Sequence, residues 1–455
     1  MAKNMVHPAA ETIFAPATVI GWAALAIVRI SGPATHDVCR RLTGRPPPAP
    51  RRATLARLHH PHTAEVLDEG LVLWFPAPGS FTGEDVLELQ VHGGRAVISG
   101  IMEALSDLPG LRPAEPGEFT RRAFLNGRLD LTAVEGLADL IDAETRAQAR
   151  QALQQLDGAL GRLYRSWRQA LLGALARLEA EIDFAPDEEV PEDLLASVRP
   201  EVDRLSAEMV THLAAGHRGE QLRAGLTVAV VGPPNAGKSS LVNRLARRDV
   251  AIVTPLPGTT RDVLEVHLDL AGYPVTLLDT AGLREAADMI EAEGVRRARD
   301  RAERADLRLI MFDGANWPAW DPATLALVDA AAVVTVNKSD LIALPGDLAV
   351  GGRAALRVSC LTGDGVQSLL EVLTARAREL MTVGHAPLLT RARHRAALQD
   401  AAEALARFSA APEGTELALM AEDLRLAARA LGRITGEVAV EDVLDRIFAE
   451  FCIGK

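Results

Sequence analysis

Lysine is nearly absent from this sequence, because only four of its 49 basic residues are lysines. The four are Lys3, Lys238, Lys338 and Lys455. A chain that otherwise uses arginine keeps lysine where a planar guanidinium cannot replace a compact ammonium group. Lys238 and Lys338 are therefore candidates for a specific chemical role, and Lys455 is either a third candidate or a solvated chain end.

Cysteine is scarce, and the chain has no excess of positive charge. The three cysteines, Cys39, Cys360 and Cys452, are far apart and match no metal-binding spacing. This usage indicates a reducing compartment, so we expect a cytoplasmic protein. The formal net charge of −12 argues against a protein that coats nucleic acid without specificity, although a local basic patch is compatible with it.

Long apolar runs are missing as well. The stretch Ile13–Val28 has no charged residue, but Pro16 and Gly21 interrupt it and Arg29 ends it. It is also short for a membrane-spanning helix. We predict a strand, a turn and a second strand here, and no membrane association.

A phosphate-binding loop is the most specific motif present. Gly232–Ser239 reads Gly-Pro-Pro-Asn-Ala-Gly-Lys-Ser and follows the β-branched run Leu226–Val231. A strand, a glycine loop and a helix start point backbone N–H groups and a helix dipole at phosphate. We expect Lys238 to reach the terminal phosphates and the Ser239 hydroxyl to ligate Mg²⁺.

Three further motifs follow in the order typical of a GTPase. Asp279 and Gly282 belong to an Asp-x-x-Gly segment. We expect Asp279 to hold Mg²⁺ through water and the Gly282 N–H to donate to the γ-phosphate. The strand Val333–Val336 leads to Asp340, whose carboxylate can accept hydrogen bonds from guanine N1–H and the 2-amino group. Ser359–Leu361 follows another strand and is expected to close over the base. The sequence therefore predicts a GTPase domain.

The residue after Asp-x-x-Gly is Leu283, where Ras-like proteins have a glutamine that orients the attacking water. Either the chain is a slow switch that depends on an outside activator, or it supplies catalysis differently. In the second case the Asn235 side chain can ligate a monovalent cation, and Glu291 can orient water. Thr259 or Thr260, in the expected switch segment, would reach Mg²⁺.

The rest of the chain predicts an α+β domain and a divided helical domain. Strands are expected at Leu25–Ile30, Gly70–Phe75 and Asp85–Val91, and a helix is expected at residues 96–105. Helical periodicity starts near residue 131 and resumes after Pro387, on both sides of the GTPase domain. A predicted helical core stripe comprises Leu153, Leu156, Leu160, Leu163, Trp167, Leu171, Ala174, Leu178 and Ile182.

These motifs resemble the MnmE (TrmE) family of tRNA-modification GTPases over nearly the whole chain. The matching segments are Phe81–Glu88, His92–Gly94, Pro116–Phe119, Arg122–Asn126, Gly258–Asp262, Asp279–Arg284 and the terminus Phe451–Lys455. The terminal Cys-Ile-Gly-Lys is the most specific of them. The resemblance implies an N-terminal α+β tetrahydrofolate-binding and dimerisation domain (1–125), a helical domain (126–222 and 383–455) and an inserted P-loop GTPase domain (223–382).

The resemblance also implies a function and partners. The protein would form a homodimer and act with the FAD-dependent protein MnmG in a heterotetramer or larger complex. Together they would place an aminomethyl or carboxymethylaminomethyl group on C5 of the wobble uridine of certain tRNAs. The one-carbon unit would come from 5-formyl- or 5,10-methylene-tetrahydrofolate, and K⁺ would stimulate GTP hydrolysis when two GTPase domains meet.

The residues that the family pattern implies are as follows. Those implied to act in catalysis are Asn235, Lys238 and Glu291. GTP contacts fall on Asn235, Ala236, Gly237, Lys238, Ser239, Ser240, Thr254, Thr259, Thr260, Asp279, Thr280, Ala281, Gly282, Asn337, Lys338, Asp340, Ser359, Cys360 and Leu361. Mg²⁺ ligands fall on Ser239 and Thr260, and K⁺ ligands on Asn235, Thr254, Leu256 and Thr259. Folate contacts fall on Arg29, Glu88, Arg128 and Lys455, and Cys452 is either near the substrate or a packing residue.

The chain departs from the family pattern at two places. Gly21–Ala26 reads Gly-Trp-Ala-Ala-Leu-Ala where the family usually has several glycines, so Trp22 and the alanines are expected to alter the folate entrance. Position 128 is Arg where Lys is common, which keeps the charge but changes the geometry.

Two other functions remain as alternatives. A ribosome-assembly GTPase would act as a binding switch, but no KH-like Gly-x-x-Gly loop follows the GTPase domain, and the net charge is acidic. A GTP-gated scaffold with a vestigial folate domain is the second alternative, and the altered segment at Trp22 supports it.

Overall fold

The structure is a computed structural model that describes most of the chain. The described residues are 11–19, 21, 23–183, 194–248, 250–252, 265–279, 304–382, 384, 387–412, 414–438, 444, 447–449, 451 and 454. The chain forms two compact units. One comprises Met1–Ala138, Gln155–Arg168 and Leu431–Lys455, and the other comprises Asp139–Gln154 and Gln169–Ala430.

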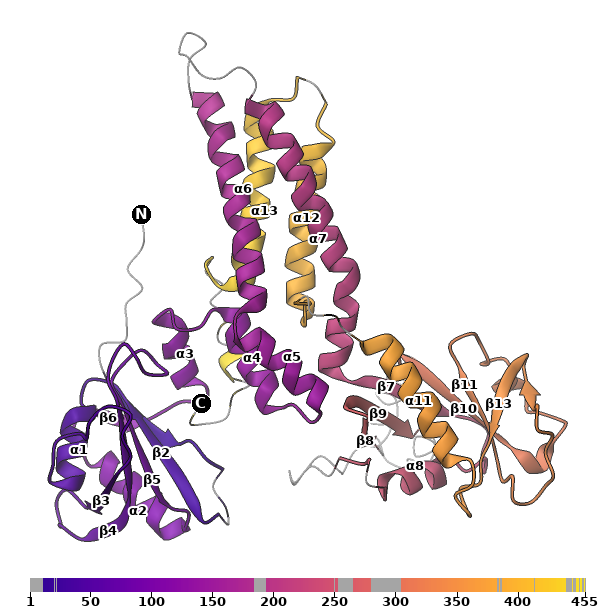
Figure 1. Cartoon of the computed structure of the whole chain (residues 1–455), viewed down its shortest axis with the longest axis horizontal. Helices are drawn as coiled ribbons and strands as arrows, with labels where there is room; N and C mark the ends of the chain where they lie inside the picture. The colour runs from indigo at the N-terminus through magenta and orange to yellow at the C-terminus, as the bar shows by residue number, and fades with distance from the viewer. Residues whose placement is uncertain are drawn as a thin grey trace, which may run out of the picture. The chain divides into compact units, whose positions relative to one another are not determined.

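The first unit contains a six-stranded sheet with the order β3-β4-β5-β2-β1-β6 (Figure 1). Its elements are β1 (Thr12–Pro16), β2 (Leu25–Ser31), α1 (Thr35–Thr43), β3 (Thr54–His59), β4 (Val66–Phe75), β5 (Val86–His92), α2 (Arg95–Ser106), β6 (Leu111–Pro113) and α3 (Glu118–Leu125). Helices α1 and α2 cover one face, where Val38 and Ile101 pack against Val28 and Leu89. On β2 the alternating residue Arg29 faces the other side, which positions the candidate folate residues.

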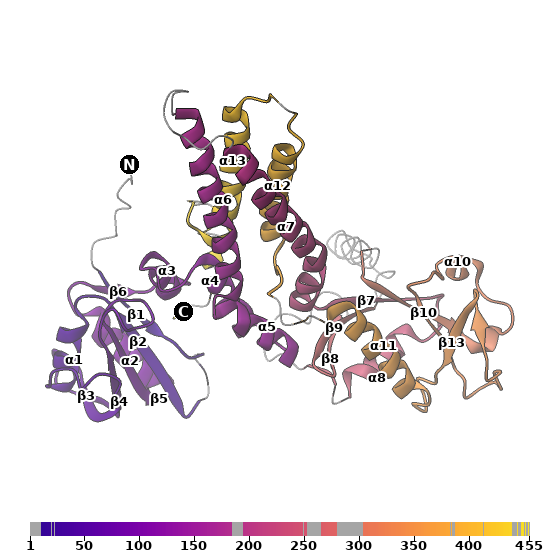
Figure 2. The ribbon, with the colours of Figure 1, turned by 45° about the horizontal axis from the view of Figure 1, so that its top comes forward.

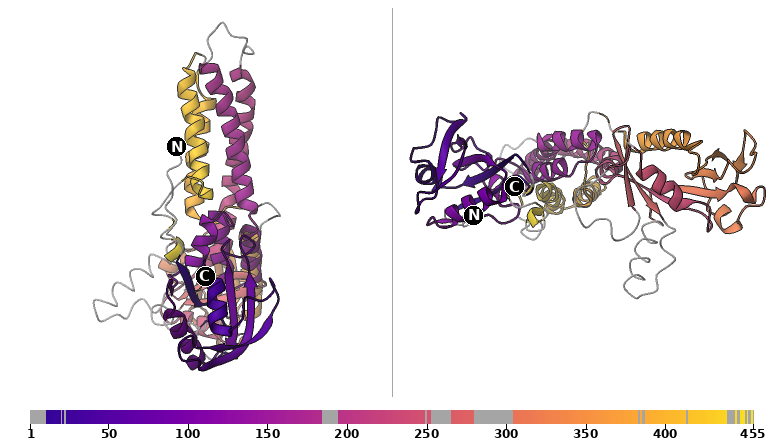
Figure 3. Two further views of the ribbon diagram at one scale, coloured as in Figure 1. Left: turned by 90° about the vertical axis from the view of Figure 1, so that its left-hand side faces the viewer. Right: turned by 90° about the horizontal axis from the view of Figure 1, so that it is seen from below.

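Among the described residues, six helices make up the helical part. They are α4 (Leu131–Ile141), α5 (Arg146–Leu156), α6 (Ala159–Asp183), α7 (Leu194–Ala224), α12 (Ala392–Ser409) and α13 (Leu417–Thr435). The four longest, α6, α7, α12 and α13, lie side by side in Figures 1 and 3. Helix α7 buries Val198, Val202, Leu205 and Met209, which recur at steps of three and four and so share one face. Helices α7 and α12 pack against each other although the GTPase elements lie between them in the sequence.

The predicted helical stripe is partly wrong. Leu160, Trp167 and Leu178 are buried, but Leu153 is 47% exposed and Ile182 is 42% exposed. Gly158, with a φ of 78°, separates α5 from α6 and shifts the helical phase between them, which accounts for the exposure of Leu153. Ile182 lies in the last turn of α6. The spacing of apolar residues in the sequence does not show where one helix ends and the next begins, so it predicted a single continuous stripe.

A seven-stranded sheet in the second unit has the order β12-β13-β11-β10-β7-β9-β8 (Figure 2). Its elements are β7 (Leu226–Val231), α8 (Lys238–Ala246), β8 (Glu265–Leu270), β9 (Tyr273–Asp279), β10 (Leu307–Asp313), η2 (Gly314–Asn316), α10 (Pro322–Leu325), β11 (Val333–Asn337), β12 (Ala349–Val350), β13 (Arg353–Arg357) and α11 (Val366–Met381). Strands β7, β9, β10, β11 and β13 are parallel, so their carboxyl ends meet at one edge.

The structure confirms the predicted fold class of an α+β part, a helical part and an α/β part inserted into the helical one. Ile13–Val28 forms β1 and the start of β2, as predicted. In the described part of the chain no helix combines the length and apolar content needed to cross a membrane. The boundaries after residues 125, 222 and 382 stay a prediction.

Two helical glycines give a test of the packing in the second unit. A Cβ atom on Gly219 of α7 would lie 2.3 Å from the Leu389 carbonyl oxygen, whereas one on Gly173 of α6 would meet nothing within 4 Å. We expect Gly219→Ala to lower the free energy of unfolding by about 1–3 kcal/mol, because the backbone at Leu389 would have to move. Urea denaturation followed by tryptophan fluorescence measures this change.

The matched control is Gly173→Ala. It is expected to raise stability by about 0.5–1 kcal/mol, because alanine restricts the unfolded chain and favours the helix. Equal unfolding midpoints for both variants would contradict the close approach of Leu389 to α7.

Candidate functional site

The phosphate loop connects β7 to α8 and depends on two glycines. A Cβ atom on Gly232 would lie 2.2 Å from the Met311 carbonyl oxygen, and one on Gly237 would lie 2.1 Å from the Asn337 Nδ2 atom. Gly237 also has a φ of 98°, a left-handed conformation that glycine adopts freely. Only glycine fits at either position without a shift of its neighbours.

The remaining loop residues present polar groups at the start of α8. Lys238 Nζ donates hydrogen bonds to the carbonyl oxygens of Gly232 and Pro233, both at 2.9 Å, so the ammonium lies across the loop. Asn235 is exposed and has a φ of 63°. Ser239 is half-buried and Ser240 is exposed in the first turn of the helix. The helix N-terminus and the lysine together form a site for an anion.

Asn337, at the end of β11, joins two of the predicted motifs. Its Nδ2 atom donates to the Ala236 carbonyl at 2.7 Å, and its Oδ1 atom accepts from the Cys360 N–H at 3.0 Å. The amide thus links the phosphate loop to the loop that is expected to cover the base. Both partners of this buried side chain are backbone groups, which a sequence motif does not identify.

The candidate base-recognition carboxylate is also held in place. Ser359 Oγ donates to Asp340 Oδ1 at 2.6 Å, and Asp340 is exposed. Lys338, with a φ of 65°, forms an ion pair with Asp313 at 2.5 Å. Asp340 can therefore accept the two hydrogen bonds that guanine offers and adenine lacks.

Two contributing residues were missed by the sequence analysis. Asp313 ends β10 and pairs with Lys338. Arg244 of α8 donates to the carbonyl oxygens of Cys360 at 2.9 Å and Leu361 at 3.1 Å, and so fixes the loop. Asp313 had a signal, because it ends an apolar strand next to β11, but nothing in the sequence of α8 distinguishes Arg244.

The loop that Arg244 holds presents an apolar surface and an unreactive thiol. Leu361 is 79% exposed, which suits contact with the face of a base. Burial raises the pKa of the Cys360 thiol to about 11, an effect that nearby Arg244 opposes and Asp340 reinforces. Cys360 is therefore a neutral packing residue at physiological pH rather than a nucleophile.

The residues described fit a Mg²⁺ site built with phosphate and water. Asp279 is buried at the end of β9, where it lies opposite Val230 of β7, next to the phosphate loop. Ser239 lies in the first turn after that loop. No group of three histidine, cysteine or acidic residues forms a metal site in the described part of the chain. A hydroxyl and a carboxylate acting through water are donors that Mg²⁺ accepts.

Several predicted residues lie outside the described part of the chain. They are Thr254, Leu256, Thr259, Thr260, Thr280, Ala281, Gly282, Leu283, Glu291, Cys452 and Lys455, together with Trp22. Their roles stay predictions.

The candidate folate residues of the first unit form a polar pair against aromatic rings. Arg29 Nε and Nη2 both lie 2.9 Å from Glu88 Oε1. The guanidinium lies 5.4 Å from the ring centre of Phe81 and 5.8 Å from that of Phe119. Arg128 packs against the adjacent Gly83. The structure thus pairs two of the four candidate residues and places Arg128 beside Gly83, two positions after Phe81.

The C-terminal segment reaches the same unit. A Cβ atom on Gly454 would lie 2.0 Å from the Pro16 carbonyl oxygen, and one on Gly117 would lie 2.4 Å from the Phe448 carbonyl oxygen. Pro16 is at the end of β1, which pairs with β2 beside Arg29. The residue before Lys455 therefore lies next to the strands that carry the candidate folate residues.

The alanines that replace the family's glycines near Trp22 show no backbone strain. None of Ala23, Ala24 and Ala26 is among the described residues with a positive φ. These three alanines and Gly21 therefore adopt backbone conformations open to any residue. A hollow of about 360 Å³ lies beside them and is lined by Gly21, Ala23, Ala24, Gly93, Gly94 and Arg95.

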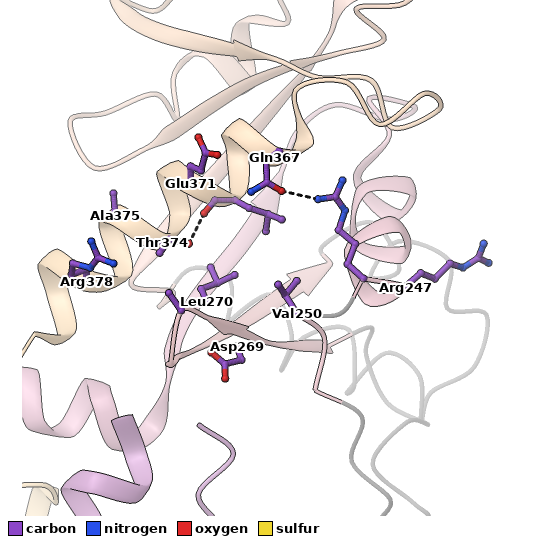
Figure 4. A pocket seen from close by; sticks show the side chains of 12 residues that line it. Arg247, Val250, Asp269, Leu270, Gln367, Glu371, Thr374, Ala375 and Arg378 are labelled. Carbon is purple, nitrogen blue, oxygen red and sulfur yellow. Dashed lines mark hydrogen bonds between the residues drawn. The ribbon is translucent and has the colours of Figure 1, made fainter. Parts of the chain in front are cut away.

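A hollow of about 670 Å³ in the second unit is separate from the phosphate loop (Figure 4). It lies between the end of α8, the β8–β9 turn and α11, and Arg248 donates to Gln367 at 3.2 Å on its rim. None of its lining residues is a candidate site residue, so we assign no part of the chemistry to it.

Replacement of the candidate guanine carboxylate gives a direct test of nucleotide choice. We expect Asp340→Asn to weaken GTP binding at least about 100-fold, because two charge-assisted hydrogen bonds are lost. The same change should strengthen the binding of xanthosine triphosphate, because the carbonyl oxygen at C2 of xanthine can accept a hydrogen bond from the asparagine amide. Fluorescent-nucleotide titration measures both affinities.

The control for this variant is Asp347→Asn, which changes the same charge at an exposed position outside the site. Unchanged GTP affinity in Asp340→Asn would remove this residue from base recognition.

Comparisons with known proteins match this chain to the same family over nearly its whole length. Residues 12–128 match the family model for the GTP-binding protein TrmE N-terminus, and residues 131–452 match the MnmE helical domain. A tRNA modification GTPase MnmE of Parvibaculum lavamentivorans is 58% identical over 98% of this chain and 100% of that protein. One from Paramagnetospirillum magneticum is 55% identical over 98% and 100%. The human mitochondrial 5-taurinomethyluridine-[tRNA] synthase subunit GTPB3 is 50% identical over 98% of this chain and 93% of that protein. The chain therefore belongs to the MnmE (TrmE) family of tRNA modification GTPases.

Proposed function

We propose that this GTPase hydrolyses GTP with K⁺ stimulation and, with the FAD-dependent partner MnmG, modifies C5 of the wobble uridine of certain tRNAs. The group added is aminomethyl or carboxymethylaminomethyl, and tetrahydrofolate supplies the one-carbon unit. The observation that carries the proposal is the assembly of the phosphate loop, Asn337, Asp340 and the 359–361 loop at one sheet edge. The names of the relatives support the tRNA substrate.

The cation hypothesis rests on Asn235. Its exposed side chain stands on a loop whose backbone turns through a left-handed conformation at this residue. An amide oxygen there suits a monovalent cation beside the phosphates, with Thr254, Leu256 and Thr259 as the further predicted ligands. A cation at this position would stabilise the charge that develops on the phosphates during hydrolysis. Leu283 cannot orient water, so Glu291 is the proposed water-positioning residue.

The folate hypothesis rests on the Arg29–Glu88 pair. A half-buried guanidinium and a carboxylate beside two phenylalanine rings offer a donor, an acceptor and flat apolar surface. These features suit a pterin ring and its polar edge. Arg128 and Lys455 are the proposed contacts to the anionic glutamate part of the ligand. Bound tetrahydrofolate would carry the one-carbon unit, and the chain's own residues would bind and orient it.

The cation hypothesis predicts a salt-specific rate. GTP turnover by the full chain should be at least about 10-fold faster in KCl than in NaCl at matched ionic strength, because a bound K⁺ replaces an arginine finger. Asn235→Ala should abolish most of this difference while GTP binding persists. Steady-state phosphate release measures the rates.

The control is Asn243→Ala, which removes an exposed amide from helix α8 at a position outside the predicted GTP and cation contacts. Equal turnover of the unaltered chain in both salts would contradict the cation hypothesis and favour a switch that needs an outside activator.

The folate hypothesis predicts a defect that leaves GTP hydrolysis intact. Arg29→Gln should weaken binding of 5-formyltetrahydrofolate roughly 10- to 100-fold, because a charge-assisted contact is lost in a half-buried site. Removal of Lys455 should also weaken it. Isothermal titration calorimetry on the full chain measures both.

The matched control is Arg57→Gln, because Arg57 also pairs with a carboxylate across the same sheet, at 2.8 Å from Glu69. Full folate affinity in Arg29→Gln, or none in the unaltered chain, would support the alternative of a vestigial folate domain.

A further inference from the structure

One segment of the first unit carries a net positive charge, in contrast to the rest of this acidic chain. Residues 36–63 contain six arginines and one aspartate, whereas the rest of the chain contains 43 basic and 60 acidic residues. The segment covers α1, the loop after it and β3. The formal net charge is therefore +5 in residues 36–63 and −17 in the rest of the chain.

Five of these arginines lie on α1 and on the loop that follows it, and we call them the α1–loop arginine patch. Its members are Arg40, Arg41, Arg45, Arg51 and Arg52, all of which are exposed. The sixth, Arg57, pairs with Glu69 on β4 and is not included. In Figures 1 and 2, α1 and β3 lie beside each other at the outer edge of the sheet.

The backbone that carries the patch is anchored. Helix α1 buries Val38, Cys39 and Leu42 against the sheet, so its opposite side is left to Arg40 and Arg41. The loop contains Pro46, Pro47, Pro48 and Pro50, which restrict the backbone. The Arg51 N–H donates to the Trp74 carbonyl at 2.8 Å, and the Arg52 N–H donates to the Ala49 carbonyl at 3.1 Å. The arginines are thus displayed on an ordered surface, and binding need not order the backbone.

Most of the patch charge is not used within the unit. Arg41 pairs with Asp37 at 2.6 Å, and Arg51 donates to the Gly79 carbonyl. Arg40, Arg45 and Arg52 make no side-chain hydrogen bond or ion pair to another described residue. Stabilisation of the α1 C-terminus accounts for Arg40 and Arg41, which lie in its last turn, but not for the three loop arginines.

We propose that the α1–loop arginine patch binds the phosphate backbone of the tRNA substrate. Guanidinium groups suit phosphate because they donate two hydrogen bonds in a planar fork. The acidic remainder of the chain repels a polyanion, so the patch also directs which face of the protein the tRNA approaches. Since contacts to phosphate carry no sequence information, the patch positions the tRNA and leaves base selection to other residues.

This inference rests on tRNA being the substrate, and it is independent of K⁺ and folate. The test uses the full chain, an unmodified tRNA transcript with uridine at the wobble position, and fluorescence anisotropy over a series of KCl concentrations. The patch variant is Arg40→Gln, Arg45→Gln and Arg52→Gln combined. The control combines Arg146→Gln, Arg218→Gln and Arg429→Gln, which removes the same charge from exposed positions elsewhere.

The patch variant should bind tRNA about 10-fold or more weakly at 100 mM KCl. The slope of log affinity against log salt should fall by about two to three, because each lost phosphate contact lowers it by about one. The control variant should change affinity less than about threefold. GTP turnover without tRNA should be the same in all three proteins, which separates a failure of this proposal from a failure of the GTPase hypothesis.

Three results would overturn the proposal. One is an equal loss of affinity in the patch and control variants, which would indicate net charge alone. Another is full tRNA affinity in the patch variant. This result would overturn the proposal even if the variant had lost the ability to bind a protein partner. The third is the absence of salt-dependent tRNA binding by the unaltered chain.

Discussion

The nucleotide site depends on the amide of Asn337, which accepts from the Cys360 N–H and donates to the Ala236 carbonyl. Because the side chain is buried, both hydrogen bonds act without competition from water, and loss of either would leave a buried polar group unpaired. The absence of a Cβ atom at Gly237 makes this approach possible. One side chain thus fixes the distance between the phosphate loop and the loop that covers the base.

In the first unit, too, glycines allow the backbone of a distant part of the chain to approach closely. Gly117 and Gly454 admit the backbone oxygens of Phe448 and Pro16, so residues at the end of the sequence pack against α3 and β1. Phe448 and Phe451 add an apolar core with Leu131 and Val134. Residues separated by more than 400 positions in the sequence therefore belong to one domain, and the predicted folate site draws on both ends of the chain.

Lysine and arginine occupy different kinds of position in this protein. Lysine is kept at Lys238 and Lys338, where a compact ammonium contacts loop carbonyls or a single carboxylate. Arginine occurs where a fork is useful, as in Arg244 across three carbonyl groups and Arg29 on Glu88. Arg40, Arg45 and Arg52 of the α1–loop patch have the same chemistry, and no other described residue uses their side-chain donors.

The sequence by itself determined the fold class, the nucleotide chemistry and the order of the motifs, because glycine spacing, strand composition and an Asp after β11 are local properties. It also indicated Asn235 and Arg29. Only the tertiary structure decided that Arg244 and Asp313 support the site, that Gly158 breaks the helical stripe, and that the alanines after Trp22 are unstrained. These depend on contacts between distant residues or on backbone angles, which periodicity and composition do not encode.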